Sequence, residues 1–174
     1  MARIIICGGN GAGKSTLGKA LACELGWKFA DIEDYYFTEN NTEYYYETAR
    51  TKEEVTALLL EDMRKHTDIV LAAVKGSYGE EVASLFDCAV LISVPKEIRM
   101  KRVWERSYQK FGDRMLPGGD MYEKEKRFFN IVEKRSENDV EEWLSSLNIP
   151  VIKIDGTQAI EKSVMVIRQE LKKL

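Results

Sequence analysis

The stretch "CGGNGAGKST", residues 7–16, decides the fold class of this 174-residue chain. From Gly8 onward it reads G-x-x-x-x-G-K-S, which is the pattern of a phosphate-binding P-loop. Glycines let such a loop curl until successive N–H groups point at an anion, and the following helix adds the positive end of its dipole. In this pattern the Lys14 amine reaches the β- and γ-phosphates, and the Ser15 hydroxyl is suited to bind Mg²⁺. The residues expected to hold the nucleotide are Gly9, Asn10, Gly11, Ala12, Gly13, Lys14, Ser15 and Thr16.

The sequence on either side of this loop supplies the context that the motif requires. Residues 3–7 form a short β-branched run that ends in glycines, which is typical of a buried strand. Residues 14–25 have the pattern of a helix, and Gly26 stands where a helix commonly ends. A strand before the loop and a helix after it favour a working nucleotide site over a chance glycine-rich turn.

Apolar runs and helical patterns alternate along the rest of the chain. Strands that are apolar throughout are buried on both faces, which predicts a parallel sheet between two layers of helices. We therefore expect one three-layer α/β domain with about five strands, a P-loop fold whose ligands bind at the carboxyl ends of the strands. The further strands are predicted over residues 27–32, 69–74, 88–94 and 151–155. The further helices are predicted over residues 52–65, 96–110 and 160–174, with one long or two short helices across 121–147.

Composition and charge exclude several classes of protein. Hydrophobic residues make up 44% and charged residues 32% of the chain, and the net charge is −3, so we expect no nucleic-acid partner and no anionic membrane surface. No apolar run approaches the roughly 18 residues that span a bilayer, and the first residues do not resemble a signal peptide. Three cysteines without framework spacing indicate no disulfide scaffold. The expectation is a cytoplasmic monomer or homodimer.

The carboxylate that would hold a metal ion is missing from its most common place. Switch GTPases and ATP-driven motors carry an aspartate at the end of a strand to hold Mg²⁺. Here the run over 69–74 ends in Val74 and Lys75, and the chain has no N-K-x-D motif for guanine. Acids follow the second predicted strand instead, where "FADIED" over 29–34 contains Asp31, Glu33 and Asp34.

A P-loop followed by acids after the second strand resembles the small P-loop kinases: shikimate kinase, gluconate kinase and adenylate kinase. The resemblance implies ATP and Mg²⁺ as cofactors and a small-molecule acceptor as partner. It places Asp31 beside Mg²⁺ and the γ-phosphate, and it turns Glu33 toward the acceptor hydroxyl. Asp34 would take either role in a shifted register. The alternative is that these acids only cap the end of a strand in solvent.

The same resemblance implies a lid over about residues 107–120. Glycines at 112, 118 and 119 would let Arg114 move on this segment and close over the transferring phosphoryl group. Arg106 resembles the arginine that stacks near adenine at the base of the lid. Asp155 and Gly156 match the loop on the adenine side by position, although Asp-Gly is also an ordinary turn before a helix.

The acceptor is left open by the sequence. Residues 34–51, "DYYFTENNTEYYYETART", hold six aromatic and four acidic side chains, which either wall a small acceptor or pack on the sheet edge. Lys75-Gly76-Ser77 stands where shikimate kinases carry three glycines, and Gly79 follows Lys75 and Tyr78 where gluconate kinases carry an arginine. The residues that the resemblance assigns to the acceptor are Asp34, Arg50, Lys75, Arg127 and Arg135.

Together these patterns predict an ATP-dependent kinase that phosphorylates a hydroxyl of a small metabolite. A nucleoside or nucleotide kinase is the first alternative, and clustering of Arg50, Arg127 and Arg135 around one site would favour it. A nucleotide-binding regulator or ATPase without an acceptor is the second alternative, and the absence of a closed pocket near residues 34–51 would favour it.

Overall fold

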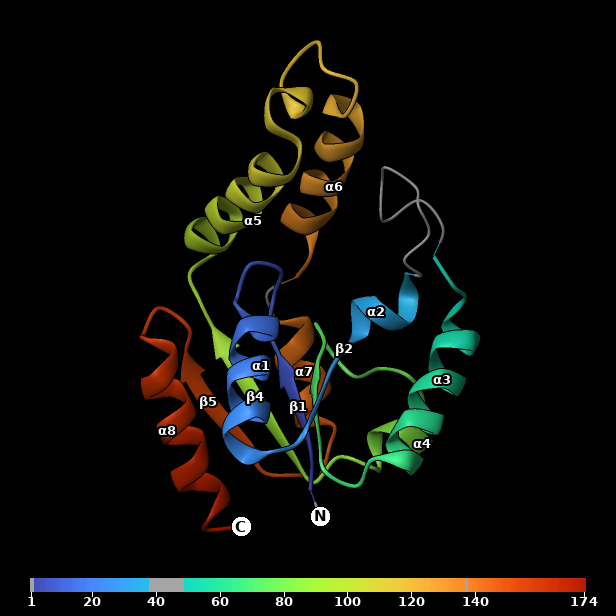
Figure 1. Cartoon of the computed structure of the whole chain (residues 1–174), viewed down its shortest axis with the longest axis vertical. Helices are drawn as coiled ribbons and strands as arrows, with labels where there is room; N and C mark the ends of the chain where they lie inside the picture. Colours follow the sequence, from blue (N-terminus) through green and yellow to red (C-terminus); the bar gives the residue numbers. More distant parts are fainter. Residues whose placement is uncertain (1, 38–48, 137) are drawn as a thin grey trace.

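A computed structural model describes residues 2–37, 49–136 and 138–174 and contains one sheet of five parallel strands. The strand order is β2-β3-β1-β4-β5, so the P-loop strand β1 lies at the centre between β3 and β4 (Figure 1). The strands are β1 (Arg3–Cys7), β2 (Lys28–Asp31), β3 (Ile69–Ala72), β4 (Cys88–Ser93) and β5 (Val151–Asp155). The predicted P-loop fold with about five parallel strands is confirmed.

Two hydrophobic cores lie on the two faces of this sheet. In β1 the side chains alternate, so Ile4 and Ile6 enter one core while Ile5 and Cys7 enter the other. The first core is closed by α1 (Lys14–Leu25) and α8 (Ile160–Leu171). The second is closed by α3 (Lys52–Lys65), α4 (Glu80–Ala83) and α7 (Asp139–Ser145) (Figure 1). The central strands are buried on both faces, as their uninterrupted apolar sequences predict.

The structure decides one open alternative and adds one element. Residues 121–147 form two helices, α6 (Tyr122–Lys134) and α7, which is the second of the two arrangements that the sequence left open. A short helix, α2 (Ile32–Tyr36), was not predicted and follows β2 directly. Asp31, at the end of β2, caps this helix by accepting a hydrogen bond from the backbone N–H of Glu33. Glu33 therefore lies in the first turn of the helix that Asp31 caps.

A pair of helices projects beyond the carboxyl end of the sheet. It consists of α5 (Lys96–Phe111), the 3₁₀ turn η1 (Gly112–Met115) and α6, and we call it the lid hairpin (Figure 1). Its tip has a small core of its own, formed by Phe111, Met115, Met121 and Phe129. The lid predicted over about 107–120 therefore coincides with this packed tip. The glycines of this segment join α5, η1 and α6, which contact one another.

Among the described helices, none is both long and apolar enough to cross a bilayer. Of the predicted acceptor segment over 34–51, the acids and aromatics within 38–48 lie outside the described residues.

Candidate active site

The P-loop is shaped by glycines at two positions whose positive φ favours glycine. Gly13 has a φ of 95° and is the residue immediately before α1. Because glycine has no side chain to cap the helix, the first N–H groups of α1 are left for an anion. Gly11 has a φ of 79°, and a Cβ built there would lie 2.3 Å from the carbonyl oxygen of Arg99. The loop is therefore held against the first turn of α5 by direct backbone packing.

Lys14 lies inside the loop and is surrounded by both carbonyl and carboxylate oxygens. Its Nζ donates a hydrogen bond of 3.0 Å to the backbone carbonyl of Gly9. Burial lowers the pKa of Lys14 from its ordinary 10.5 to about 8, and the negative charges of Glu33 and Asp31 oppose that change. A phosphate in the loop would raise the pKa again, so this amine is suited to bind one.

Ser15 and Asp31 meet across the gap between the P-loop and β2. The Ser15 hydroxyl donates a hydrogen bond of 2.5 Å to the carboxylate of Asp31. Mg²⁺ at nucleotide phosphates is usually held by one or two protein oxygens together with phosphates and waters, so this pair fits the ion. Within the described ranges no group of three or more metal-binding side chains gathers elsewhere, and Ser15 with Asp31 stays the candidate metal pair.

Glu33 and Asp34 point to different surroundings, although they are neighbours on α2. Glu33 lines a large cleft at the carboxyl end of the sheet, whereas Asp34 is exposed and is not among its lining residues. Burial and the charge of Asp31 raise the pKa of the Glu33 carboxyl, while Arg106 and Lys14 oppose this. The structure thus separates the two acids that the sequence left in either register.

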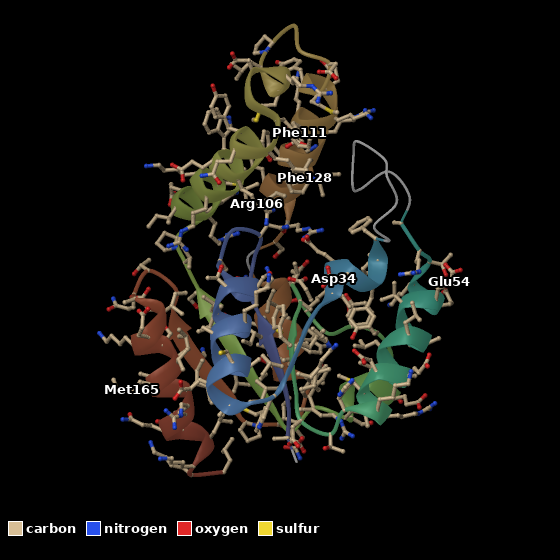
Figure 2. All side chains as sticks on the ribbon, in the orientation of Figure 1. Asp34, Glu54, Arg106, Phe111, Phe128 and Met165 are labelled. Atoms are coloured by element: carbon tan, nitrogen blue, oxygen red, sulfur yellow. The ribbon has the colours of Figure 1, made fainter. Side chains whose placement is uncertain are left out.

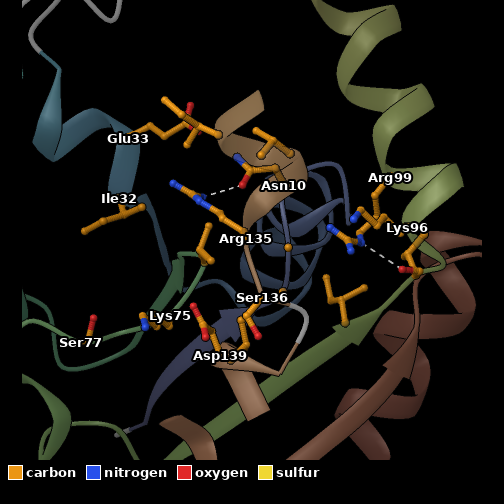
Figure 3. A pocket seen from close by; sticks show the side chains of 18 of the residues that line it. Asn10, Ile32, Glu33, Lys75, Ser77, Lys96, Arg99, Arg135, Ser136 and Asp139 are labelled. Atoms are coloured by element: carbon orange, nitrogen blue, oxygen red, sulfur yellow. Dashed lines mark hydrogen bonds between the residues drawn. The ribbon is translucent and has the colours of Figure 1, made fainter. Parts of the chain in front are cut away.

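The cleft has a volume of about 1150 Å³ and lies between the P-loop, α2, the β3–α4 loop and α6. Figure 3 shows Glu33, Lys75 and Arg135 around it. Arg135 donates a hydrogen bond of 2.6 Å from Nη1 to Oδ1 of Asn10 and so links the end of α6 to the P-loop (Figure 3). The sequence-predicted residues that line the cleft are Gly9, Asn10, Glu33, Lys75, Arg127 and Arg135.

Aromatic side chains form one wall of this cleft. Tyr36 and Tyr78 have ring centroids 6.3 Å apart, and Phe37 lies 6.1 Å from Tyr36. Tyr35 is different, because its hydroxyl hydrogen-bonds Asp62 on α3 and its ring packs with the core. Of the aromatics in the described part of 34–51, Tyr36 and Phe37 therefore line the cleft while Tyr35 is structural.

A second and smaller pocket, of about 290 Å³, lies on the other side of the P-loop. It is lined by Gly13 of the P-loop, by Thr16 of α1 and by Gly156 of the β5–α8 turn. This is the place that the sequence assigns to the base of the nucleotide. Asp155 organises the turn, since its carboxylate accepts hydrogen bonds from Thr157 and Gln158.

Arg102 is the residue of this pocket that the sequence interpretation missed. Its guanidinium donates two hydrogen bonds of 3.2 Å to the carbonyl of Gly156 and one of 3.4 Å to that of Gly11. Arg106 lies one turn further along α5, at the base of the lid hairpin (Figure 2). Burial is the main influence on the pKa of Lys14, which it lowers, and on the pKa of Glu33, which it raises. The positive charge of Arg106 acts on both groups and lowers each pKa.

The two arginines are four residues apart and share a face of α5, which was the available signal for Arg102. Arg102 occupies the surroundings expected for Arg106, whereas Arg106 is exposed and lines neither pocket.

Arg114 and Arg50 line neither pocket in the described structure. Arg114 lies at the tip of the lid hairpin, where its guanidinium forms hydrogen bonds of 2.9 and 2.5 Å with the carboxylate of Asp120. Arg50 donates from Nη1 to the carbonyl of Tyr35 at 2.9 Å, which ties the segment before α3 to α2. Of the arginines predicted to surround the acceptor, Arg127 and Arg135 come together and Arg50 does not.

Comparison with known proteins concerns the family and the fold of the chain. A family model described as "AAA domain" matches residues 4–143. The uncharacterized protein YqaC of Bacillus subtilis (strain 168) is 31% identical over 169 residues, and the match covers 92% of each chain. A probable gluconokinase of Mus musculus is 51% identical over 37 residues, which are 21% of this chain and 20% of that protein.

Among solved structures, the shikimate kinase of Bacteroides thetaiotaomicron superimposes with a TM-score of 0.60 at 22% identity. The match covers 99% of both chains. At this level of identity the similarity concerns the fold, and it confirms the resemblance to the small P-loop kinases that the sequence predicts.

Proposed function

The chain belongs to the AAA-domain family of P-loop proteins, and from that membership we propose that it is an ATP- and Mg²⁺-dependent kinase for a hydroxyl group of a small metabolite. The fold is that of the shikimate and gluconate type of P-loop kinase, which implies ATP binding. One observation carries the proposal beyond the fold. Glu33, adjacent to the Ser15–Asp31 pair, lines a cleft that begins at the P-loop.

The nucleotide would be held by groups on both sides of the P-loop. The free N–H groups at the start of α1 and the Lys14 amine would bind the β- and γ-phosphates. Gly156 and Thr16 border the pocket that would take the base, with Arg102 joining that pocket to the loop. Ser15 and Asp31 would hold Mg²⁺, which when bound would neutralise part of the charge on the phosphates.

Glu33 would act on the acceptor. Its carboxylate lines the cleft close to Lys14, so it can orient an acceptor hydroxyl and take its proton as the hydroxyl attacks the γ-phosphorus. Lys14 and Arg106 supply positive charge where negative charge spreads over the transferring group. The Arg114 guanidinium lies at the hairpin tip, so its contribution would require the hairpin to close over the cleft.

A nucleoside or nucleotide kinase stays the second candidate because Arg127 and Arg135 both line the cleft. The third candidate, an ATPase without an acceptor, has less support because a cleft large enough for a small molecule adjoins the P-loop.

A metabolite panel tests these candidates. The purified chain is incubated with Mg²⁺, ATP and one of a set of hydroxy acids, sugars, nucleosides or nucleoside monophosphates, and both ADP and phosphorylated product are measured. The kinase proposal expects a product with one panel member and its loss in Glu33→Gln. ADP release that no panel member increases, and that Glu33→Gln does not change, would overturn the proposal in favour of an ATPase.

A further inference from the structure

The helix that carries Glu33 is too short to hold an orientation by itself. α2 has five residues, of which only Ile32 is fully buried. Helices of this length are not stable alone in water, because the first turn fixes several dihedral angles for a single hydrogen bond. The rotation of α2 about its axis therefore depends on the contacts that it forms with neighbouring elements.

One of these contacts joins the Tyr35 side chain to α3. The Tyr35 hydroxyl donates a hydrogen bond to Oδ2 of Asp62, and its half-buried ring packs against the core that α3 closes. Burial and this hydrogen bond raise the pKa of Tyr35, so the hydroxyl stays protonated and remains a donor. The other oxygen of Asp62 lies 3.5 Å from Nε2 of His66, so the carboxylate has a neighbour on each side that orients it.

Tyr35 and Glu33 lie on opposite sides of α2. They are two residues apart, which in an α-helix is a rotation of about 200°. While Tyr35 is bound to α3, Glu33 is therefore on the side that lines the cleft. A rotation of α2 by one residue, about 100°, would put Ile32 or Asp34 in the place of Glu33.

The other contacts of α2 act through its backbone. Asp31 accepts a hydrogen bond of 3.1 Å from the N–H of Glu33, and Arg50 donates one of 2.9 Å to the carbonyl of Tyr35. These bonds lie near the helix axis, whereas the hydroxyl of Tyr35 lies at the end of a long side chain. A bond at a larger radius resists rotation more strongly, so the bond between Tyr35 and Asp62 has the greatest effect on which side chain faces the cleft.

We propose that Tyr35 and Asp62 are positioning residues that fix the rotation of α2 and thereby keep Glu33, rather than Asp34, in the cleft. Neither of the two lines the cleft in the described structure, and Tyr35 acts through the helix that it shares with Glu33. The inference rests on the proposed function, in which Glu33 acts on the acceptor, and it names two residues on which that role depends.

The ionisation of Glu33 measures its position without any acceptor. Burial raises the pKa of the Glu33 carboxyl, the charges of Asp31 and Asp34 act in the same direction, and those of Arg106 and Lys14 oppose them. The carboxyl ¹³C signal of Glu33 is identified in the full chain by its loss in Glu33→Gln and is followed by NMR as the pH is raised. It should titrate above the ordinary 4.5.

Tyr35→Phe keeps the ring but loses the bond to Asp62. It removes no charge, so the pKa of Glu33 should fall toward 4.5 by about half a pH unit or more as α2 turns this carboxyl toward water. With the acceptor that the metabolite panel identifies, kcat should fall about tenfold or more. KM for ATP should change less than about twofold, because the P-loop is untouched.

Two variants of Asp62 and one control complete the test. Asp62→Ala should reproduce both changes of Tyr35→Phe, whereas Asp62→Asn keeps an acceptor oxygen for the hydroxyl and should restore kcat to within about threefold. Tyr108→Phe is the matched control, because it also loses a tyrosine–aspartate hydrogen bond, of 2.9 Å to Asp113, but on the lid hairpin. It should leave the titration of Glu33 and kcat unchanged.

The outcomes separate this inference from the kinase proposal. An unchanged titration of Glu33 in Tyr35→Phe, even with a lower melting temperature, would overturn the inference and leave the kinase intact. An Asp62→Asn variant that behaves like Asp62→Ala would overturn it as well. A shifted titration of Glu33 in a protein that phosphorylates no acceptor would overturn the kinase and leave the positioning of Glu33 in place.

Discussion

The hydroxyl of Ser15 donates a 2.5 Å hydrogen bond to the carboxylate of Asp31, and this contact joins the P-loop to the carboxyl end of β2. β2 lies at the edge of the sheet, two strands away from β1. The segment after β3 carries Val74 and Lys75, so it has no acid to place beside the P-loop serine. Asp31, at the end of the outer strand β2, occupies that position instead.

Replacing Asp31 should impair metal use more than nucleotide binding. Asp31→Asn keeps the shape of the side chain but removes its charge, so we expect turnover to fall about 10- to 100-fold and the Mg²⁺ concentration for half-maximal rate to rise. Binding of ADP without metal should change little. A Mg²⁺ titration of the initial rate checks this, with Asp68→Asn, at the opposite end of the sheet, as control. An unchanged Mg²⁺ dependence would move the metal role away from Asp31.

The lowered pKa of Lys14 predicts a pH dependence of nucleotide binding. Below pH 8 the amine is charged, and above the pKa of about 8 the free protein loses this charge, so affinity for ADP should fall as pH rises from 7 to 9.5. Stability should respond in the opposite sense. The buried cation destabilises the fold below pH 8, and that cost is relieved as pH rises toward 10.5.

Fluorescent ADP titrated at each pH measures the effect. Lys14→Arg keeps its charge over this range and should lose the alkaline decline, while Lys14→Ala should bind weakly at every pH. A decline of the same size in Lys14→Arg would assign it to another group.

Glu33 and Asp34 should behave very differently when each loses its charge. Glu33→Gln should lower the transfer rate about 10²- to 10⁴-fold, the usual range for a general base, whereas Asp34→Asn should retain nearly full activity. Because burial raises the pKa of Glu33, the acidic limb of kcat/KM should lie above the ordinary carboxyl range and vanish in Glu33→Gln. Rates from pH 4.5 to 8 measure this. Equal losses in the two variants would exclude a special role for Glu33.

Arg102 and Arg106 should affect different kinetic constants. Arg102→Ala removes the link between Gly156 and Gly11, so KM for ATP should rise about tenfold with little loss of kcat. Arg106→Ala removes charge beside Lys14 and Glu33, so it should lower kcat mainly. Lys101→Ala on the exposed face of α5 is the control. The reverse pattern would exchange the two roles.

Glycine 11 should be required for the fold as well as for the nucleotide. Gly11→Ala combines a positive φ with a Cβ 2.3 Å from the Arg99 carbonyl, so it should cost about 2–5 kcal/mol of unfolding free energy. Gly26→Ala has a similar φ of 69° but open space around it, so about 1–2 kcal/mol is expected. Urea denaturation of both variants compares them. Equal losses would show that the packing against α5 contributes nothing.

Much of the candidate phosphate-binding side of the site could be predicted from the sequence, because the patterns that indicate it are local. The P-loop, the helix that ends at Gly26 and the acids after β2 lie within 27 consecutive positions, from Gly8 to Asp34, and the backbone brings them together. Arg102 was missed because its partners, Gly11 and Gly156, lie far away in the chain. Arg114 was assigned to the phosphates from its position in a glycine-rich segment, while its pairing with Asp120 depends on how the hairpin tip packs.

The sequence by itself determined the fold class, the phosphate-binding loop and the candidate metal pair, because strand and helix periodicity and glycine spacing act over a few residues. Tertiary structure alone decided which acid of α2 faces the cleft, which arginine reaches the β5–α8 turn, and that Lys75 and Arg135 share a wall with Tyr36 and Tyr78. These relations depend on the strand order β2-β3-β1-β4-β5 and on how α5 and α6 stand above it, since that packing brings segments more than a hundred residues apart within hydrogen-bonding distance.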